Sequence, residues 1–454
     1  MRPLLHLDVL QPEHAVDSSR GDPVNCAEFH QHSGVPPSPS LGTRSPGISS
    51  AHRAVPGDGR PSQDRRDIRS ARRLLGSVPS CRITAHATLG SSVITATSGI
   101  MASIMTHKIC PLALQDLDDL GRFLIAGFDA KLDADFAALD VLRWKYLEPR
   151  GEDDEAPRSY LAREEEGHVI GHVGICRTTF EGNAIPGGHI ATLHMIDWLG
   201  SAQHRSVGAS LMRKAHDSVP TQFGLGGSEA GRTVIKRGGY KTKNSIPVYQ
   251  RVLRPSHWLR VPALGFAAKG SRLARDLVRR ALLPARSAPV RVDLSRVTSF
   301  DSAIEPITER ARAHAILTGR NPKRLSHLLQ FPRQAMSGWH LVAPPDRLCG
   351  FAVLNLVPQH GGRVWLGKIV DCLLADTDVR LWQGAILALT QELGRQGADV
   401  AQTFASTPWM AEALHRSGFA SRFVLEFSLR DRQKLLPPGI PYHLMPIEAD
   451  YAYT

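Results

Sequence analysis

Residues 189–212 read His-Ile-Ala-Thr-Leu-His-Met-Ile-Asp-Trp-Leu-Gly-Ser-Ala-Gln-His-Arg-Ser-Val-Gly-Ala-Ser-Leu-Met, and this stretch decides the fold. Its first part, 189–198, predicts a long strand, and 206–217 predicts a helix. The loop of small residues between them leaves backbone N–H groups unpaired at the start of the helix. These groups, together with the helix dipole, can hold a pyrophosphate. The stretch therefore indicates an α/β fold with an anion-binding turn.

The same alternation extends to both sides of this stretch. Before it and after it, the first half predicts a strand at 107–112, a helix at 113–128, strands at 159–164 and 168–176, a strand at 222–226, a helix at 229–238 and a strand at 246–253. From residue 292 the order repeats, with a helix at 302–318, strands at 339–342, 348–357 and 363–373, a helix at 377–395, a strand at 399–404, a helix at 408–417 and a strand at 423–429. Two halves with one element order suggest a duplicated domain.

The chain before this pattern has a different composition. It is rich in Pro, Gly and Ser, and Phe29 is its only aromatic residue before position 100. Such a segment cannot bury enough apolar surface to offset the entropy of ordering, which predicts disorder over 1–104. A start codon assigned too early is the alternative, with Met101 or Met105 as the natural start. The predicted organisation is a first domain at 105–254, a basic linker at 255–291, a second domain at 292–445 and a tail at 446–454.

Composition excludes several classes of protein. With 42% hydrophobic and 22% charged residues, the chain is neither fibrous nor wholly disordered. No apolar run reaches the length of a membrane span, which is about 18–20 residues. The six cysteines show no Cys-x-x-Cys spacing, which argues against a zinc ribbon and a redox dithiol. Scattered single thiols predict a reducing compartment and a cytoplasmic location.

The net charge of +12 is concentrated in one place. Residues 254–291 hold nine Arg or Lys residues and one acid, Asp276, so this stretch alone carries +8. Within it, 266–283 predicts a basic amphipathic helix with Leu273, Leu277 and Leu282 on one side. A linker helix packed on a domain, attachment to an anionic membrane surface and nucleic-acid binding all stay open for this helix. Because no aromatic and basic platform accompanies it, nucleic acid is not the expected partner.

Two motifs in the first half resemble those of the GNAT superfamily of acyl-CoA N-acyltransferases. Gln203, Ser206 and Gly208 take the three defined positions of its Q/R-x-x-G-x-G/A loop, with Ser206 in place of the first Gly. Residues 228–240 follow its later pattern, from Ser228 at the Asn position to Gly239-Tyr240 at the Gly-Phe end. The resemblance implies two mixed α/β GNAT-like domains, each a central mixed sheet with flanking helices.

The resemblance also implies an activity, the transfer of an acyl group from acyl-CoA to an amine by direct attack. Acetyl-CoA would be the cosubstrate, no metal would take part, and the acceptor would be an amine of a small molecule or sugar. The alternative is a catalytically silent CoA-binding or protein-interaction module. The residues implied in CoA binding are Ile196, Trp198, Gln203, His204, Arg205, Ser206, Val207, Gly208, Ala209 and Ser228.

Three residues are candidates for the base that removes the amine proton: His194, Asp197 and Glu229. An imidazole that titrates near neutrality suits this step, although His194 could equally be a structural histidine. Glu229 could instead be a favourable charge at a helix N-terminus. The usual tyrosine acid of the family is replaced by Ile235, and Tyr240 is expected to pack in place of the family's Phe.

The second half carries weaker motifs. Its loop positions align with Val379, Trp382 and Gly384, and the indole of Trp382 is expected to block a phosphate. This half is therefore predicted to be a degenerate copy. The acceptor pocket is expected to include Trp144, Tyr146 and Tyr249.

Overall fold

The structure is a computed structural model that describes residues 107–149, 156–204, 206–282, 287–448 and 452. The predicted disorder of 1–104 and the predicted CoA contact of Arg205 lie outside these residues. In the first half the strands are β1 (Lys108–Pro111), β2 (Ser159–Arg163), β3 (Val169–Glu181), β4 (His189–Gly200), β5 (Thr221–Leu225) and β6 (Lys241–Val252). Its helices are α1 (Leu117–Gly127), α2 (Leu139–Tyr146), α3 (Val207–His216) and α4 (Glu229–Arg237).

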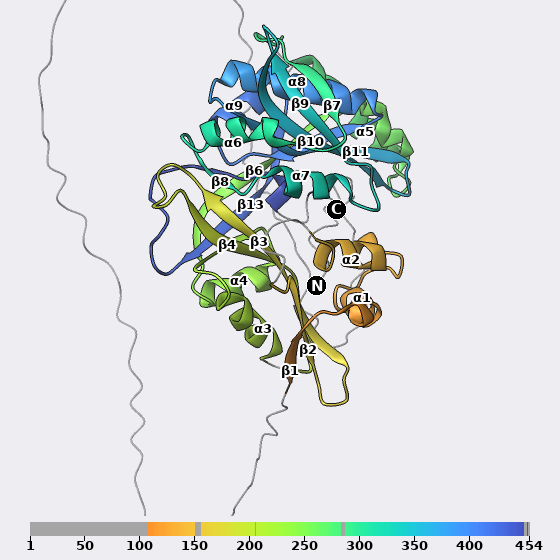
Figure 1. Cartoon of the computed structure of the whole chain (residues 1–454). Helices are drawn as coiled ribbons and strands as arrows, with labels where there is room; N and C mark the ends of the chain where they lie inside the picture. Colours follow the sequence, from red (N-terminus) through yellow and green to blue (C-terminus); the bar gives the residue numbers. More distant parts are fainter. Residues whose placement is uncertain (1–106, 150–155, 205, 283–286, 449–451, 453–454) are drawn as a thin grey trace, which may run out of the picture. The chain divides into compact units, whose positions relative to one another are not determined.

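Helix α5 (Phe266–Leu282) connects this half to the second one (Figure 1). The strands there are β7 (Asp293–Val297), β8 (Ile316–Thr318), β9 (Ser337–Ala343), β10 (Arg347–Gln359), β11 (Val364–Leu374), β12 (Val400–Phe404), β13 (Ala420–Asp431) and β14 (Tyr442–His443). The helices are α6 (Glu305–Ala311), α7 (Pro322–Leu329), α8 (Val379–Arg395) and α9 (Pro408–Arg416). The predicted mixed α/β class with a repeated element order is confirmed.

All described strands belong to one mixed sheet, which the sequence did not predict. Its main order is β1-β2-β3-β4-β5-β13-β6-β12-β11-β10-β9-β7. The last strand of each half is exchanged, because β13 pairs with β5 of the first half and β6 pairs with β12 of the second. The two exchanged strands also pair with each other, antiparallel, at the centre of the sheet. The two halves therefore share a continuous sheet rather than having one sheet each.

Each half opens its sheet at one parallel pair of strands. Strands β4 and β5 pair only from Thr192 to His194, after which β4 continues to Gly200. Strands β11 and β12 pair only from Leu366 to Lys368, after which β11 continues to Leu374. Splayed parallel strands leave backbone groups without a ladder partner, so each opening is a place where another chain or a ligand can bind.

Helices cover both faces of the first half's sheet (Figure 1). The side chains of α1 and α2 pack on one face, around Leu161 and Ile196. Helix α3 packs on the other face, against Ile175 and Leu193. The close approach of α3 depends on a glycine in β3, since a Cβ at Gly171 would overlap the side chains of Val207 and Leu211.

Two predictions in the second half and linker were wrong in detail. The helix predicted over 302–318 ends at Ala311, and the chain continues into β8, which pairs with both β3 and β14. Helix α5 forms as predicted, but its buried residue is Asp276. Leu277, Val278 and Leu282 are exposed, so this part of the expected apolar side does not pack on the domain, whereas Leu273 packs against the cluster of Trp258, Val261 and Leu264. The indole of Trp258 donates to Asp276 at 2.7 Å, and this hydrogen bond anchors the helix.

Candidate functional site

The opening between β4 and β5 begins beside a bulge in β4. His172 faces Leu199 and Gly174 faces Ile196, so β4 has one residue more than β3 between these pairs. Asp197 lies in this bulge with a φ of 47°, a left-handed conformation that is unusual for a residue other than Gly or Asn. The bulge interrupts the alternation of side chains. Ile196 and Asp197 both contact α2 or its neighbours, whereas the Trp198 indole reaches α3.

Asp197 is held in a buried ion pair. Its Oδ2 accepts hydrogen bonds from Lys145 Nζ and Tyr146 Oη, both at 2.5 Å. Burial alone would raise the pKa of Asp197, but the charge of Lys145 and these two hydrogen bonds outweigh it, and the pKa is lowered. Asp197 therefore stays ionised, and its contacts are those of a residue that fixes α2 to the bulge.

His172 completes the same cluster on the β3 side. Its Nδ1 donates to the carbonyl oxygen of Asp197 at 2.8 Å, and its Nε2 lies 2.8 Å from Ser159 Oγ. Burial lowers the pKa of His172 to about 4, so the ring is neutral at pH 7. Neither Lys145 nor His172 was singled out in the sequence, because they lie in α2 and β3 and carry no local motif.

His194 lies on β4 at the last residue that pairs with β5. Its ring stacks on Phe223, with centroids 5.1 Å apart, and Nδ1 lies 2.9 Å from the carbonyl oxygen of Glu448. Because a carbonyl can only accept, Nδ1 carries the proton, which leaves the lone pair on Nε2. Burial lowers the pKa of His194 to about 4. The imidazole is therefore a neutral proton acceptor at pH 7, with 7% of the residue exposed.

The N-terminus of α3 has no side-chain cap. Ser206 occupies the N-cap position with a φ of 78°, and its hydroxyl makes no capping hydrogen bond. The first backbone N–H groups of a helix have no intrahelical partner. Those of Gly208 and Ala209 therefore point out of the helix start, whereas the Val207 N–H donates to the His204 carbonyl at 3.4 Å. Gly200 at the end of β4 lies against the backbone of Gly208, where a Cβ on Gly200 would come within 3.0 Å of the Gly208 nitrogen.

Side chains of the preceding loop brace this helix start. The indole of Trp198 donates to the Gly208 carbonyl at 3.0 Å. Ser201 Oγ accepts from the backbone N–H of Gln203 at 3.3 Å and lies 3.2 Å from His204 Nδ1. His204 Nε2 is 3.2 Å from Glu164, the residue that directly follows β2. The described residues that were predicted to contact CoA, from Ile196 to Ala209, thus lie around the bulge and the start of α3.

Two predicted residues belong to α4. Ser228 is the N-cap of this helix, and its Oγ accepts from the Gly231 N–H at 3.1 Å. Glu229 is exposed in the first turn, as expected of a charge that stabilises a helix N-terminus. Tyr240 is buried and donates to Gln222 Oε1 at 3.0 Å, so it packs like a core aromatic residue.

In the second half the opening is filled by the chain itself. Residues 442–444 cross it, because His443 Nε2 donates to the Cys372 carbonyl of β11 at 3.1 Å. On the other side, Ser406 follows β12 and donates to the Tyr442 carbonyl at 2.5 Å. In the first half, no hydrogen bond joins residues 195–200 of β4 to residues 224–228, all of which are described.

The second helix start also differs from the first. Asp378 caps α8 by accepting from the Arg380 N–H at 2.8 Å, which places a carboxylate where an anion would bind. The alignment of Val379, Trp382 and Gly384 with the first loop was wrong, because Val379 already begins α8 as Val207 begins α3. Trp382 is buried in the core and does not occupy the loop. The element that blocks this site is therefore Asp378, together with the segment 442–444.

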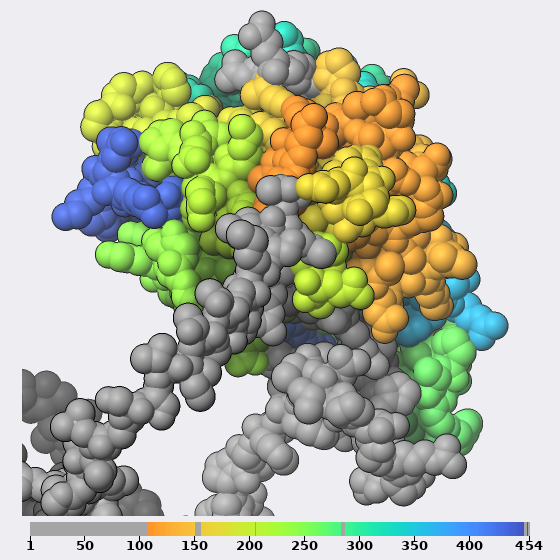
Figure 2. Space-filling view, turned by 90° about the horizontal axis from the view of Figure 1, so that it is seen from below, coloured from red at the N-terminus to blue at the C-terminus, as the bar shows by residue number. Residues whose placement is uncertain are grey.

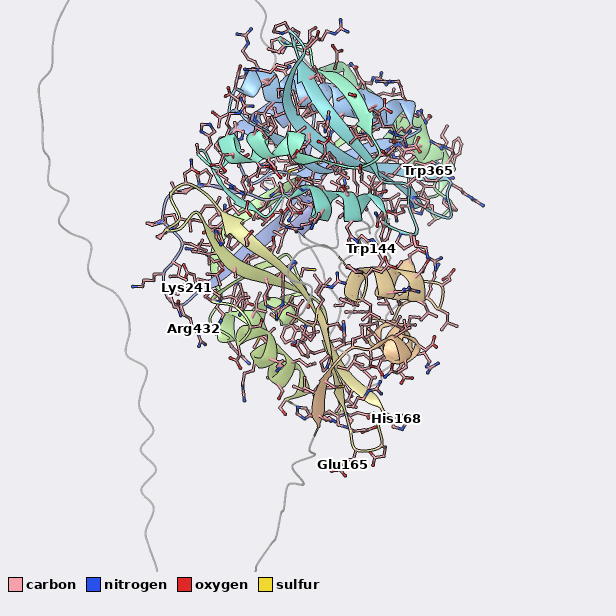
Figure 3. All side chains as sticks on the ribbon, in the orientation of Figure 1. Trp144, Glu165, His168, Lys241, Trp365 and Arg432 are labelled. Atoms are coloured by element: carbon pink, nitrogen blue, oxygen red, sulfur yellow. The ribbon has the colours of Figure 1, made fainter. Side chains whose placement is uncertain are left out.

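The three expected acceptor residues do not lie together. Trp144 stacks on His327 of α7, with centroids 4.8 Å apart, and borders a cavity of about 480 Å³ between α1, α2 and the residues after α7. Figure 3 labels Trp144 at this position. Tyr146 is the partner of Asp197, whereas Tyr249 lies on the exchanged strand β6 in the core of the second half. Figure 2 shows the outer surface of the α1–α2 region, in orange.

The described part of the chain has no group of three or more His, Cys, Asp or Glu side chains that could hold a metal ion. Across the same residues, no helix is long and apolar enough to cross a membrane.

Comparisons with known proteins gave matches to solved structures only. No protein-family model matches the sequence, and no curated protein matches it. The chain is similar to a GCN5-related N-acetyltransferase from Anabaena variabilis, at 12% identity over 71% of this chain and 72% of that one, with a TM-score of 0.47. It is also similar to Saccharomyces cerevisiae N-myristoyltransferase with bound myristoyl-CoA (12% identity, 75% and 83%, TM-score 0.49). A third match is a putative acetyltransferase from Pyrococcus horikoshii (12% identity, 76% and 95%, TM-score 0.45).

The repeated element order, and the helix that follows the long central strand of each half, are those that the sequence predicted. The described chain has a tandem GNAT-like fold with a single continuous sheet.

Proposed function

We propose that the protein is an acyl-CoA-dependent N-acyltransferase that binds its acyl-CoA in the first half. The observation that supports this most is the contrast between the two openings. The one at β4 and β5 is not bridged and leads to an uncapped helix start, whereas the other is filled and capped. The domains would be residues 105–254 and 292–445, the acceptor an amine of a small molecule or sugar, and the location the cytoplasm.

The chain offers a separate contact for each part of acyl-CoA. The pyrophosphate would lie at the start of α3, where the N–H groups of Gly208 and Ala209 point outward. Gly208 suits this role because it carries no side chain that could stand between the backbone and the phosphates. The pantetheine amides would pair with the backbone of β4 beyond His194, which lacks a ladder partner on the β5 side.

In the reaction, the amine nitrogen attacks the thioester carbonyl carbon. A C–N bond forms, the C–S bond breaks, and the electron pair leaves with the CoA sulfur. The proton lost by the nitrogen moves to Nε2 of His194, whose Nδ1–H is fixed by the Glu448 carbonyl. An imidazole with a pKa of about 4 is a weak base, but the nitrogen becomes far more acidic once the C–N bond has formed.

A silent CoA-binding module is the second candidate. It is favoured by Ile235 at the position of the usual acid and by the engagement of Asp197 with Lys145 and Tyr146. Both candidates predict acyl-CoA binding in the first half, and only the enzyme predicts turnover.

Calorimetry with acetyl-CoA and myristoyl-CoA, followed by thiol release against a panel of amines, tests these candidates. We expect His194→Gln to lower the rate about 100-fold while acyl-CoA affinity stays unchanged, since general bases contribute about 10²–10⁴-fold. His314→Gln, at an exposed position, is the matched control. Binding without turnover would favour the silent module, and the absence of binding would reject both.

A further inference from the structure

A cavity of about 520 Å³ lies away from the proposed acyl-CoA site, between α5, α8 and the exchanged strands β6 and β13. Its volume falls within the range of pockets for small ligands. Apolar side chains, among them Val252, Leu253 and Leu387, form part of the wall. None of the residues predicted for catalysis or CoA binding lines it.

Four arginines converge on this cavity. Arg251 comes from β6, Arg422 from β13, and Arg279 and Arg280 from α5. Burial and the neighbouring Arg280 lower the pKa of Arg251, and burial and Arg279 lower the pKa of Arg422. Like charges thus face one another across the cavity.

The described residues supply little opposite charge there. No described carboxylate lies within ion-pair distance of any of the four arginines. The one acid in the wall is Asp276. That carboxylate is already engaged, because it accepts from Trp258 Nε1 at 2.7 Å and from Arg275 Nε at 3.0 Å.

The position of Arg422 results from an irregularity in β13. Ser421 faces Tyr249 and Phe423 faces Val248, so Arg422 is the extra residue of a bulge. A bulge redirects the side chain of its extra residue. The Nε atom of Arg422 is buried and has no hydrogen-bond partner among the described residues. An unsatisfied buried donor is costly, so a ligand that accepts from it would stabilise this arrangement.

We infer that this cavity binds the phosphate group of an organic molecule whose apolar body lies against Val252, Leu253 and Leu387. Several guanidinium forks around one point match the oxygens and the double charge of a phosphate monoester. A single carboxylate would leave most of the positive charge uncompensated. The site is independent of the proposed acyl-CoA site in the first half.

The phosphate could belong to a free metabolite or to a lipid headgroup. The second source is consistent with the exposed apolar residues of α5, since Leu277 is 51% and Leu282 is 73% exposed. Both residues lie on the helix that supplies Arg279 and Arg280. The shared chemistry is the phosphate monoester, and the experiment has an arm for each source.

Calorimetry of the full chain with glycerol 3-phosphate at low salt tests the free form. We expect Arg251→Gln with Arg422→Gln to weaken binding about tenfold or more, because charge-assisted hydrogen bonds are lost. Arg296→Gln on β7, which is exposed, should leave it unchanged. Gly208→Glu should also keep this binding while it loses acyl-CoA, which separates failure of this site from failure of the proposed function.

Flotation with phosphatidylcholine vesicles, with and without phosphatidic acid, tests the lipid form. Flotation of the protein with the vesicles would assign the site to a lipid if it needs phosphatidic acid. It should then be lost in the double arginine variant and in Leu277→Ser with Leu282→Ser. Binding of glycerol 3-phosphate without flotation on these vesicles would assign the site to a free phosphate compound. The inference is overturned if neither probe binds, or if the double arginine variant, with an unchanged unfolding curve, binds like the wild type.

Discussion

The two strand openings of this molecule have the same framework, but only the second is filled by a segment of the chain. In each, a bulged strand holds a buried aspartate that pairs with a basic residue. Asp197 lies within the bulge of β4, and Asp371 lies next to Val370, the extra residue of the bulge in β11. The first opening leads to a helix without a cap, whereas residues 442–444 cross the second and Asp378 caps its helix. The comparison indicates that a duplicated fold can convert a ligand site into a structural joint by filling it with its own chain.

The largest expected effect concerns the filled opening between β11 and β12. Arg320 is fully buried, with Nε 3.0 Å from Asp371 Oδ2 and a terminal nitrogen 2.9 Å from Glu448 Oε1. Arg320→Ala leaves two buried carboxylates without their cation, so we expect a loss of about 3–5 kcal/mol of unfolding free energy. Denaturant titration measures it.

The control for this variant is an exposed pair. Arg333 lies 2.7 Å from Asp140, and both side chains are more than 40% exposed. We expect Arg333→Ala to cost about 0–1 kcal/mol. Equal losses for the two variants would contradict the view that the second opening is a structural joint.

The next prediction compares the two helix starts. Gly208 and Arg380 are each the second residue of their helix, α3 and α8. Gly208→Glu places a carboxylate beside the proposed pyrophosphate site, and we expect acyl-CoA affinity to fall about 100-fold from charge repulsion of about 3 kcal/mol. A Cβ there would lie 3.7 Å from Trp198, an ordinary contact, so the fold should survive.

Arg380→Glu is the matched variant in the second half and should leave the affinity unchanged. Gly384→Glu is unsuitable, because its Cβ would overlap the Val290 carbonyl oxygen. If Arg380→Glu loses acyl-CoA while Gly208→Glu keeps it, the active half has been assigned the wrong way round. Calorimetry with acetyl-CoA distinguishes these outcomes.

The third prediction uses pH to compare the histidines of the two openings. Burial lowers the pKa of His194 to about 4 and that of His443 to about 3, below the ordinary value of 6.5. Between these values the unfolded chain binds more protons, so stability falls as the pH drops from 6.5 towards 4, by about 1.4 kcal/mol per unit for each histidine.

We therefore expect His443→Gln and His194→Gln each to flatten this slope, as measured by denaturant unfolding at several pH values. An unchanged slope in either variant would mean that its histidine is not buried as a neutral ring. His314→Gln, at an exposed position, is the control.

The smallest expected effect concerns Ser406, which joins the end of β12 to the segment that crosses the second opening. Its Oγ donates to the Tyr442 carbonyl and accepts from the Leu444 N–H at 2.7 Å. Ser406→Ala should cost about 1–2 kcal/mol, because two buried backbone groups lose a partner. Ser201→Ala, in the exposed loop of the first half, should cost less in the same thermal unfolding measurement. The reverse order would contradict the contrast between a filled and an unfilled opening.

Local signals predicted much of the fold. The strand at 189–198 and the helices at 206–217 and 377–395 formed within a few residues of their expected bounds. Their apolar periodicity and flanking small residues are local properties of the chain. The exchange of β6 and β13 was not predicted, because alternation shows that a segment is a strand but not which strand it pairs with.

The candidate site was predicted in outline only. His194, Asp197 and the loop before α3 lie together, whereas the ion-pair partner Lys145 is 52 residues away from Asp197 and has no motif. The sequence contains a signal for the carboxylate that caps α8 in the second half. An aspartate directly before an apolar helical stretch is a typical N-cap, and Asp378 has this position. Helix α7 also begins with a cap, Asn321, followed by Pro322, although no helix was predicted there.

The exchanged strand β13 has a consequence for the order in which the protein can be completed on the ribosome. Strand β5 leaves the exit tunnel about two hundred residues before its neighbour β13, whose Phe427 faces Leu225. Until then the edge of β5 has no partner, and contacts this distant in sequence form slowly. The first half therefore cannot finish its sheet while it is being synthesised. The proposed activity of that half can begin only after β13 has emerged, so products truncated before β13 would be inactive even though they contained His194 and the start of α3.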